Sequence, residues 1–291
     1  MAGTALAAIL LILPLQAAPP VTRQASVQAR LRVLEARSGG RLGVAVLDTG
    51  SGRRIDYRSG ERFPLCSTFK VLLAGAVLAR VDAGQEALDR PIEYRRTDLL
   101  EHAPVTAARV AEGHLTVTEL CGAAVSESDN TAANLLLGTL GGPTALTAFV
   151  RRLGDARTRL DRWEPDLNEA RPGDPRDTTT PRAMVEDLRT LLLGTVLTAD
   201  SRQRLESWMA ACSTGRNKLR AGLPAGWTAG DKTGAGRRGT MNDVALLRPP
   251  GQAPILVAAY LTGSGASWDH REALFAELGR LVAAECSPAA P

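Results

Sequence analysis

The segment "FPLCSTFKVLLAGAVL" (residues 63–78) combines a strongly apolar run with two polar side chains near its start. A run this apolar predicts a helix that is buried on all sides. A lysine ammonium is costly to remove from water unless it is paired or deprotonated. The spacing of Ser67 and Lys70 places both side chains on one helix face, one turn apart. It would hold a hydroxyl and an amine within proton-transfer distance, and the alternative is a solvated lysine near a helix end.

The sequence around this helix predicts strands near both ends of the chain and helices between them. Two β-rich runs lie within residues 41–57 and three more within residues 226–265, while the signals from 64 to 209 are almost wholly helical. We therefore predict an α/β plus all-α fold. An antiparallel sheet would be flanked by N- and C-terminal helices, with an inserted helical domain.

The predicted domain boundaries follow from these period changes. Residues 19–63 and 213–291 would form a discontinuous α/β domain, and residues 64–212 an all-helical domain that includes a long loop over 160–178. Residues 1–18 are typical of a signal peptide, with an apolar centre followed by small residues, although no Lys or Arg precedes that centre. No cysteine lies near the cleavage region, so we expect an exported protein, periplasmic or secreted, without a lipid anchor.

Composition excludes several function classes. The chain has 291 residues, 44% hydrophobic and 23% charged, with a net charge of +4, which is typical of a soluble globular protein. No basic run is interleaved with aromatic residues, so nucleic acid is not expected as a partner. The histidines are dispersed and the cysteines show no C-x-x-C spacing, so we expect no metal site. The four cysteines, whose three possible full pairings stay open, are Cys66, Cys121, Cys212 and Cys286.

Three further motifs accompany the S-x-x-K spacing. "SDN" (128–130) lies between helical segments, "WEPDLN" (163–168) lies in the long loop, and "DKTGAG" (231–236) ends a strand. Glycines in the last motif allow a ligand to approach the backbone closely. Each motif is a weak signal alone, but the three together, in this order and context, are a specific one.

These motifs are those of the class A serine β-lactamases, which the chain resembles from residue 21 to residue 285. The resemblance implies that Ser67 is an acylated nucleophile and that either Lys70 or Glu164, through a water molecule, is its base. Ser128 would pass a proton to the departing ring nitrogen. Glu164, helped by Asn168, would activate the water that frees the acyl group.

The resemblance also implies a set of substrate contacts. The backbone N–H groups of Ser67 and Ala235 would form the oxyanion hole. Lys232 and Thr233 would hold the substrate carboxylate, and Asn130 its side-chain amide. The loop would depend on an ion pair between Arg162 and Asp177, and the Glu164–Pro165 bond is a candidate cis peptide.

The sequence departs from the family pattern near the carboxylate pocket. Positions where relatives supply an arginine hold Met241 and Glu272, which leaves Lys218 as the candidate carboxylate contact; the alternative is an exposed helix-end lysine. Gly236 replaces a cysteine that would bridge Cys66 in carbapenem-hydrolysing relatives.

The predicted activity is hydrolysis of penicillins and earlier cephalosporins, giving antibiotic resistance. We expect no metal or organic cofactor, no membrane anchor and a monomer. Two alternatives acylate without turnover, namely a penicillin-binding transpeptidase or carboxypeptidase and a β-lactam-sensing receptor. The "WEPDLN" loop favours the hydrolase, because the resemblance assigns deacylation to that loop.

Overall fold

The computed structural model describes Met1 and residues 23–287, so the predicted signal peptide lies almost wholly outside the described residues. A five-stranded antiparallel sheet occupies the centre, in the order β2-β1-β9-β8-β7. Its strands are β1 (Arg41–Asp48), β2 (Arg54–Tyr57), β7 (Thr228–Gly236), β8 (Thr240–Arg248) and β9 (Ile255–Thr262). Early and late parts of the chain therefore share one sheet, joined where β1 pairs with β9.

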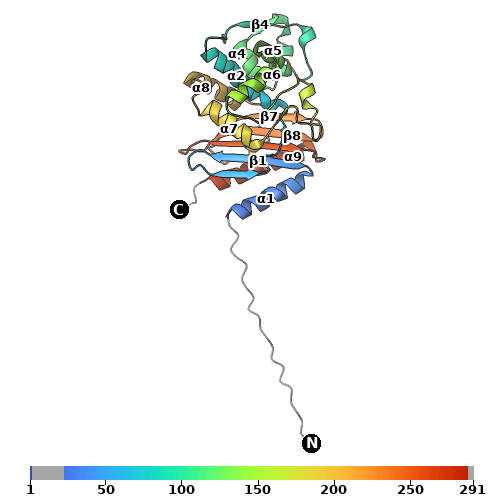
Figure 1. Ribbon diagram of the computed structural model, residues 1–291, viewed down its shortest axis with the longest axis vertical. Coiled ribbons are helices and arrows are strands. Elements are labelled where there is room, and N and C mark those ends of the chain that lie inside the picture. The colour runs from blue at the N-terminus through green and yellow to red at the C-terminus, as the bar shows by residue number, and fades with distance from the viewer. Residues whose placement is uncertain (2–22, 288–291) are drawn as a thin grey trace.

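Helices cover both faces of the sheet (Figure 1). The helices from the two ends of the described chain, α1 (Arg23–Ser38) and α9 (Trp268–Cys286), lie together on one face. The opposite face contacts α7 (Pro181–Leu192) and α8 (Ala199–Ala210). The remaining helices of this layer are α2 (Phe69–Asp82), α3 (Pro104–Ala108), α4 (Val117–Ser126), α5 (Asn130–Leu140) and α6 (Pro143–Arg152). The predicted fold class is confirmed by this arrangement, while the domain boundaries remain a prediction.

Two apolar clusters lie on opposite faces of the sheet. Side chains alternate along β9, so Val257 and Ala259 join the cluster beneath α1 and α9, whereas Leu256 and Ala258 join the helical cluster. The sheet is consequently buried on both faces, which explains its nearly continuous apolar strands.

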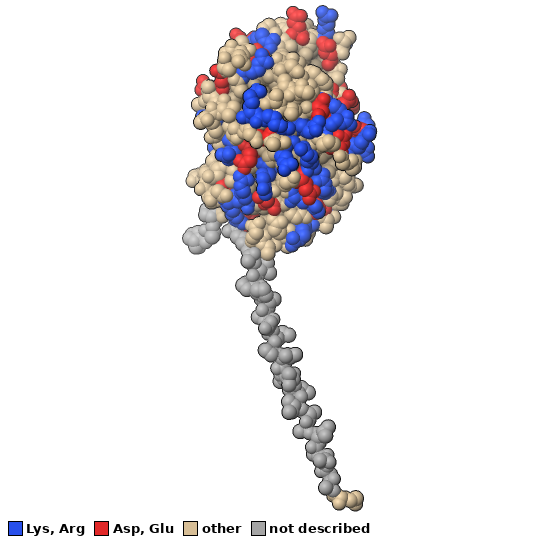
Figure 2. Space-filling view, in the orientation of Figure 1, with Lys and Arg blue, Asp and Glu red and all other residues tan. Residues whose placement is uncertain are grey.

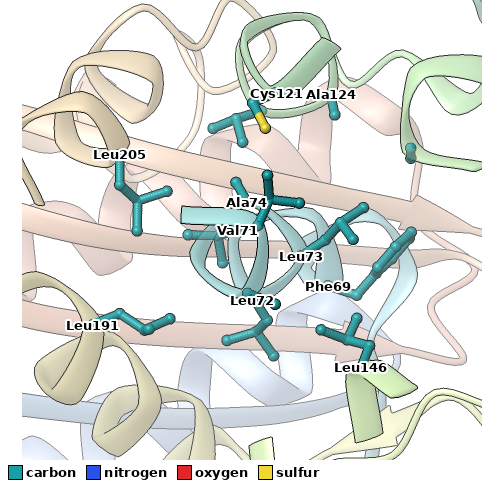
Figure 3. Close-up of a cluster of buried hydrophobic side chains, with 14 of the residues drawn as sticks. Phe69, Val71, Leu72, Leu73, Ala74, Cys121, Ala124, Leu146, Leu191 and Leu205 are labelled. Atoms are coloured by element: carbon teal, nitrogen blue, oxygen red, sulfur yellow. The ribbon is translucent and has the colours of Figure 1, made fainter. Parts of the chain in front are cut away.

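Helix α2 lies at the centre of the helical cluster. Leu72, Leu73 and Val71 point in different directions around it and meet side chains from α4, α6, α7 and α8 (Figure 3). The approach to α7 is so close that a Cβ on Gly75 would meet Leu191 Cδ1 at 2.8 Å. Truncating a fully buried leucine such as Leu73 to alanine would cost about 2–5 kcal/mol of stability.

The start of this helix differs slightly from the prediction. Ser67 lies in a 3₁₀ turn, Cys66–Thr68, and the α-helix begins at Phe69. Cys66 has a φ of +43°, a left-handed conformation that is uncommon for a residue with a Cβ. Strained residues of this kind persist where the surrounding structure fixes them.

The largely helical region also contains short strands that the sequence pattern did not predict. They are β3 (Phe63–Pro64), β4 (Pro91–Glu93), β5 (His114–Thr116) and β6 (Thr178–Thr179). Segments of two or three residues are too short to show an alternating pattern. Pairing of β3 with β6 attaches the end of the long loop to the segment just before Ser67.

Within the described chain, no single helix has the length and hydropathy needed to cross a membrane. One bent pair, α5 with α6, meets those two criteria together. Nor do the described residues contain a group of three or more His, Cys, Asp or Glu side chains placed to hold a metal ion.

Candidate active site

The turn that carries Ser67 is held by contacts to the backbone carbonyl groups just before it. Asn242 on β8 donates from Nδ2 to the carbonyl oxygens of Pro64 and Leu65, at 2.9 and 3.0 Å. The Thr68 hydroxyl donates to the Leu65 carbonyl at 2.7 Å. Buried contacts to sheet and backbone therefore fix the turn before any substrate binds.

Lys70 is fully buried one helical turn after Ser67. Its Nζ donates to Asn130 Oδ1 at 2.6 Å and to the Ser128 carbonyl at 2.8 Å, and it lies 3.1 Å from Glu164 Oε1. Burial lowers the pKa of Lys70 from its ordinary value, and the Glu164 carboxylate opposes that shift. The alternative of a solvated helix-end lysine is wrong.

Glu164 brings the long loop to the nucleophile. Its side chain is fully buried, and the Ser67 hydroxyl donates to Oε1 at 3.3 Å. Asn168 Nδ2 donates to the other carboxylate oxygen, Oε2, at 2.5 Å. The Glu164–Pro165 peptide bond is cis, as predicted. One carboxylate oxygen thus faces both the hydroxyl and the amine.

The "SDN" turn contacts both buried lysines of the site, Lys70 and Lys232. Asp129 caps α5 by accepting from the Ala132 N–H at 2.8 Å, and it also accepts from the Thr106 N–H at 2.9 Å. Ser128 has a φ of +60°, which turns this residue out of the helical path. Its Oγ accepts from Lys232 Nζ at 3.0 Å.

Lys232 is the second fully buried lysine, on strand β7. Its Nζ also donates to the Thr233 carbonyl at 2.9 Å, and the Thr233 hydroxyl lies 2.5 Å from that of Thr214. Desolvation lowers the pKa of Lys232 to about 8. A lysine that is protonated at neutral pH but close to its pKa can bind an anion or take part in proton transfer.

The long loop is anchored at its base. Arg162 Nε lies 2.6 Å from Asp177 Oδ2, and Asp177 also accepts from the backbone N–H groups of Asp161 and Arg162. Asp177 is buried, so the ion pair is shielded from water. The predicted pairing of Arg162 with Asp177 is confirmed.

A cleft of about 720 Å³ opens beside these groups. Asn130, Asn168 and Ala235 line it, together with His102, which is exposed and lies 3.1 Å from the Glu127 carbonyl oxygen through Nε2. Two of its lining residues contact the buried pair, since Asn130 contacts Lys70 and Asn168 contacts Glu164. Its volume is in the range of small-molecule sites.

Lys218 lies apart from this group. It is buried rather than exposed, and its Nζ donates to Glu272 Oε1 at 3.0 Å and to the Thr214 carbonyl at 2.7 Å. Thr214 is its link to the site, because the Thr214 hydroxyl contacts that of Thr233. The exposed alternative for Lys218 is therefore wrong, and its direct contact to substrate stays a prediction.

Three supporting residues were missed by sequence reasoning. Asn134 makes two hydrogen bonds to the backbone of Glu164. Its Nδ2 donates to the Glu164 carbonyl at 3.0 Å, and its Oδ1 accepts from the Glu164 N–H at 3.1 Å. It lies one helical turn after Asn130, so the i, i+4 spacing in "SDNTAAN" could have placed both on one face. Asn242 and Thr214 carry no comparable local signal, because their contacts depend on segments distant in sequence.

The buried cysteines do not form a disulfide within the described part of the chain. A Cβ on Gly236 would lie 2.6 Å from Cys66 Sγ, so position 236 directly faces that thiol. Burial raises the pKa of Cys66 above its ordinary value, which keeps the thiol protonated.

Comparisons with known proteins agree with this geometry. Residues 26–286 match a family model described as the beta-lactamase enzyme family, so the chain belongs to that family. A curated relative, Beta-lactamase AST-1 of Nocardia asteroides, is 51% identical, with 90% of this chain and 84% of the relative covered. An ancestral class A β-lactamase, GNCA, has a similar structure, with a TM-score of 0.88, 62% identity and coverage of 89% and 99% of the two chains. A second solved structure is the class A β-lactamase GNCA4, described as the last common ancestor of Gram-negative bacteria. It has a TM-score of 0.88 and 63% identity, with 90% of this chain and 99% of that chain covered.

Proposed function

We propose that this protein is a serine β-lactamase that hydrolyses the β-lactam ring through an acyl-enzyme on Ser67 and so confers antibiotic resistance. The observation that carries the proposal is the position of Glu164 Oε1, 3.3 Å from the Ser67 hydroxyl and 3.1 Å from Lys70 Nζ. A buried carboxylate next to the nucleophile can activate water, which separates hydrolysis from simple capture of the drug.

Acylation begins when Ser67 Oγ attacks the ring carbonyl carbon. Its proton passes to Lys70, if that amine is neutral, or to Glu164 through a water molecule. The carbonyl–nitrogen bond then breaks, and the ring nitrogen takes the Ser128 hydroxyl proton. The proton that left Ser67 restores the Ser128 hydroxyl by way of Lys70, so Glu164 is an ionised carboxylate when deacylation begins. The backbone N–H groups of Ser67 and Ala235 would stabilise the oxyanion.

Deacylation uses the same carboxylate. Glu164 removes a proton from a water molecule, which attacks the ester carbonyl and expels Ser67 Oγ; the serine then regains its proton. The contact from Asn168 to the second carboxylate oxygen supports a fixed orientation of Glu164. This step consumes one water molecule per turnover and no cofactor.

Substrate binding is proposed for groups at the cleft edge. Lys232 and Thr233 would hold the substrate carboxylate, and Asn130 the side-chain amide. Lys218 would add to the carboxylate site from beside Thr214. We expect its contribution to be smaller than that of Lys232, because the ion pair with Glu272 at 3.0 Å offsets its charge.

Penicillins and earlier cephalosporins are the proposed substrates. Gly236 faces Cys66 but offers no sulfur for a disulfide, which argues against carbapenem hydrolysis by the route of the disulfide-bearing relatives. The transpeptidase and receptor alternatives are not favoured, since the curated relative and solved neighbours are named as β-lactamases.

A turnover count tests the proposal. A chromogenic cephalosporin is added in large excess and product is counted per protein molecule. We expect many turnovers per molecule. A single stoichiometric burst with no further product would indicate an acylated protein without hydrolysis, as expected of a transpeptidase or receptor.

Export as a monomer to the periplasm or the medium is part of the same proposal. Export is supported by the apolar character of residues 1–18 and by the small residues at the end of that segment. We also propose that residues 19–63 and 213–291 form one discontinuous domain and residues 64–212 the other. The membership of β1, β2 and β7–β9 in one sheet supports that division.

A further inference from the structure

A second cavity lies behind the long loop and shares no lining residue with the catalytic cleft. Its volume is about 690 Å³. One wall is the loop arm at residues 170–175, and the opposite wall is formed by the sheet ends at residues 40–41 and 262–263, with Arg62, Pro64, Thr178 and Arg238 completing the lining. We call it the arginine cavity, because Arg41, Arg62, Arg171 and Arg238 line it.

Part of this positive charge is matched by carboxylates. Arg41 pairs with Glu61 at 2.9 Å, and Arg171 pairs with Glu169 at 2.5 Å. The single acidic residue in the lining, Asp174, is bound by Arg176 at 2.7 Å, which is not itself in the lining. These pairs leave Arg62 and Arg238 as the uncompensated charges.

Arg62 is half-buried and surrounded by other cations. Its Nη1 donates to the Arg157 carbonyl at 2.7 Å and the Thr178 hydroxyl at 3.0 Å, and among the described residues it has no carboxylate within ion-pair distance. Burial lowers the pKa of Arg62, and the charges of Arg157, Arg159 and Arg151 lower it further, while the Asp155 carboxylate opposes the shift. A partly desolvated cation without an ion pair is energetically unfavourable, and a bound anion would relieve it.

Arg238 supplies the second free guanidinium, from the turn between β7 and β8. It is exposed, and its side chain makes no ion pair or hydrogen bond with any described residue. Its backbone is fixed, with a φ of +57° and a carbonyl that accepts from Gly263 N at 2.9 Å.

Elsewhere on the surface, many basic side chains pair with carboxylates, as Arg248 does with Glu206 and Arg109 with Glu112. Lys and Arg form a band across the face drawn in Figure 2, interrupted by Asp and Glu. The arginine cavity differs because it is concave and its two free guanidinium groups line one space. Guanidinium groups match the oxygens of tetrahedral phosphate with paired hydrogen bonds.

We propose that the arginine cavity binds a condensed phosphate, with Arg62 and Arg238 as its principal contacts. The anion would join the loop arm to the sheet ends. We choose a ligand of several linked phosphate groups because the cavity, at about 690 Å³, has room for it and because two arginines from different segments line it. The proposal concerns binding alone and does not depend on ring-opening chemistry.

The test uses inorganic tripolyphosphate and isothermal titration calorimetry on the full chain at low ionic strength. We expect saturable binding with a Kd of about 1 mM or lower, weakening as salt is added. Arg238→Gln should weaken binding about tenfold, and the pair Arg62→Gln with Arg238→Gln more, because charged hydrogen bonds are lost.

Two control variants distinguish binding in the arginine cavity from binding elsewhere on the protein. Arg204→Gln removes an exposed arginine outside the cavity, with the same charge change, and should leave the Kd unchanged. Lys232→Gln tests binding in the catalytic cleft and should also leave it unchanged. No saturable binding by the unmodified protein would overturn the proposal, as would binding that survives Arg238→Gln but is lost with Lys232→Gln. If the variant at the half-buried Arg62 does not fold, Arg238→Gln alone is sufficient for the test.

Discussion

The two sides of loop 160–178 treat buried charge in opposite ways. On the cleft side, Lys70 and Glu164 are fully buried within 3.1 Å of each other, and every contact of the carboxylate is to a group that takes part in the site. In the arginine cavity, Arg62 is half-buried, the charges of three arginines outweigh that of one carboxylate, Asp155, and no described carboxylate forms an ion pair with it. Matched charge holds a fixed geometry for chemistry, whereas unmatched charge leaves donors available for a ligand.

Removing the nucleophile should have the largest effect. Ser67→Ala deletes the hydroxyl that forms the acyl-enzyme, and we expect turnover of a chromogenic cephalosporin to fall by about 10⁴-fold or more. Ser38→Ala, at another buried serine outside the site, is the control and should retain turnover. Substantial turnover by Ser67→Ala would place the nucleophile elsewhere.

Removing the ion pair between Arg162 and Asp177 tests whether the position of Glu164 depends on it. Arg162→Ala leaves Asp177 buried without its cation, which should destabilise the fold by about 3 kcal/mol. Displacement of Glu164 should slow deacylation by about 10–100-fold, more than acylation, since a misplaced base can cost that much. Pre-steady-state kinetics and urea unfolding measure the two effects.

The matched control on the same loop is Arg176→Ala. Its ion pair with Asp174 lies at the surface, with Arg176 45% exposed, and should contribute about 0–1 kcal/mol. Equal losses in the two variants would show that any arginine on the loop matters equally, and that the buried pair has no special role.

A pH profile tests the role of Lys232. The pKa of about 8 means that this lysine loses its charge as the pH rises through that value. We expect kcat/KM for substrates bearing a carboxylate to fall about tenfold per pH unit above it. Lys232→Arg should move this decline to higher pH, because arginine keeps its proton. A profile that is unchanged by the substitution would assign the decline to another group.

A small effect on stability is expected from a buried acidic residue on α7, Asp187. Burial, followed by the nearby Asp155 carboxylate, raises the pKa of Asp187 well above its ordinary value, while Arg151 opposes the shift. The folded protein therefore keeps a proton that the unfolded chain releases, and stability falls as pH rises from about 4 through the folded pKa.

Asp187→Asn removes that titration. Relative to the unmodified protein, its stability should increase with pH, by about 1–2 kcal/mol between mildly acidic and mildly alkaline solution. Urea unfolding at both pH values gives the difference. Parallel pH dependence in the two proteins would show that Asp187 does not hold the extra proton.

Much of this site could be predicted from sequence because its residues fall in short motifs on regular elements. Ser67 and Lys70 are one helical turn apart, and the position of Glu164 followed from the family resemblance. Asn242 and Thr214 could not be predicted, because they reach the site through the register of the sheet and a loop far along the chain.

The fold likewise contains elements that a local sequence pattern predicts and elements that it does not. Alternation and turn residues predicted the five sheet strands, whereas β3 and β6 are two residues each and exist only because distant segments meet. The sequence left open whether Lys218 is exposed for a related reason: its partner Glu272 comes from α9, far along the chain. The arginine cavity likewise joins residues from 40 to 263.

The most direct test of the central claim is the mass of Glu164→Ala after mixing with a penicillin. If Glu164 is the base for deacylation, the variant should accumulate an adduct of one penicillin per protein, mapped by peptide analysis to Ser67, while the unmodified protein turns over and returns to its free mass. A Glu164→Ala protein that shows no adduct and hydrolyses penicillin at the unmodified rate would contradict the assignment.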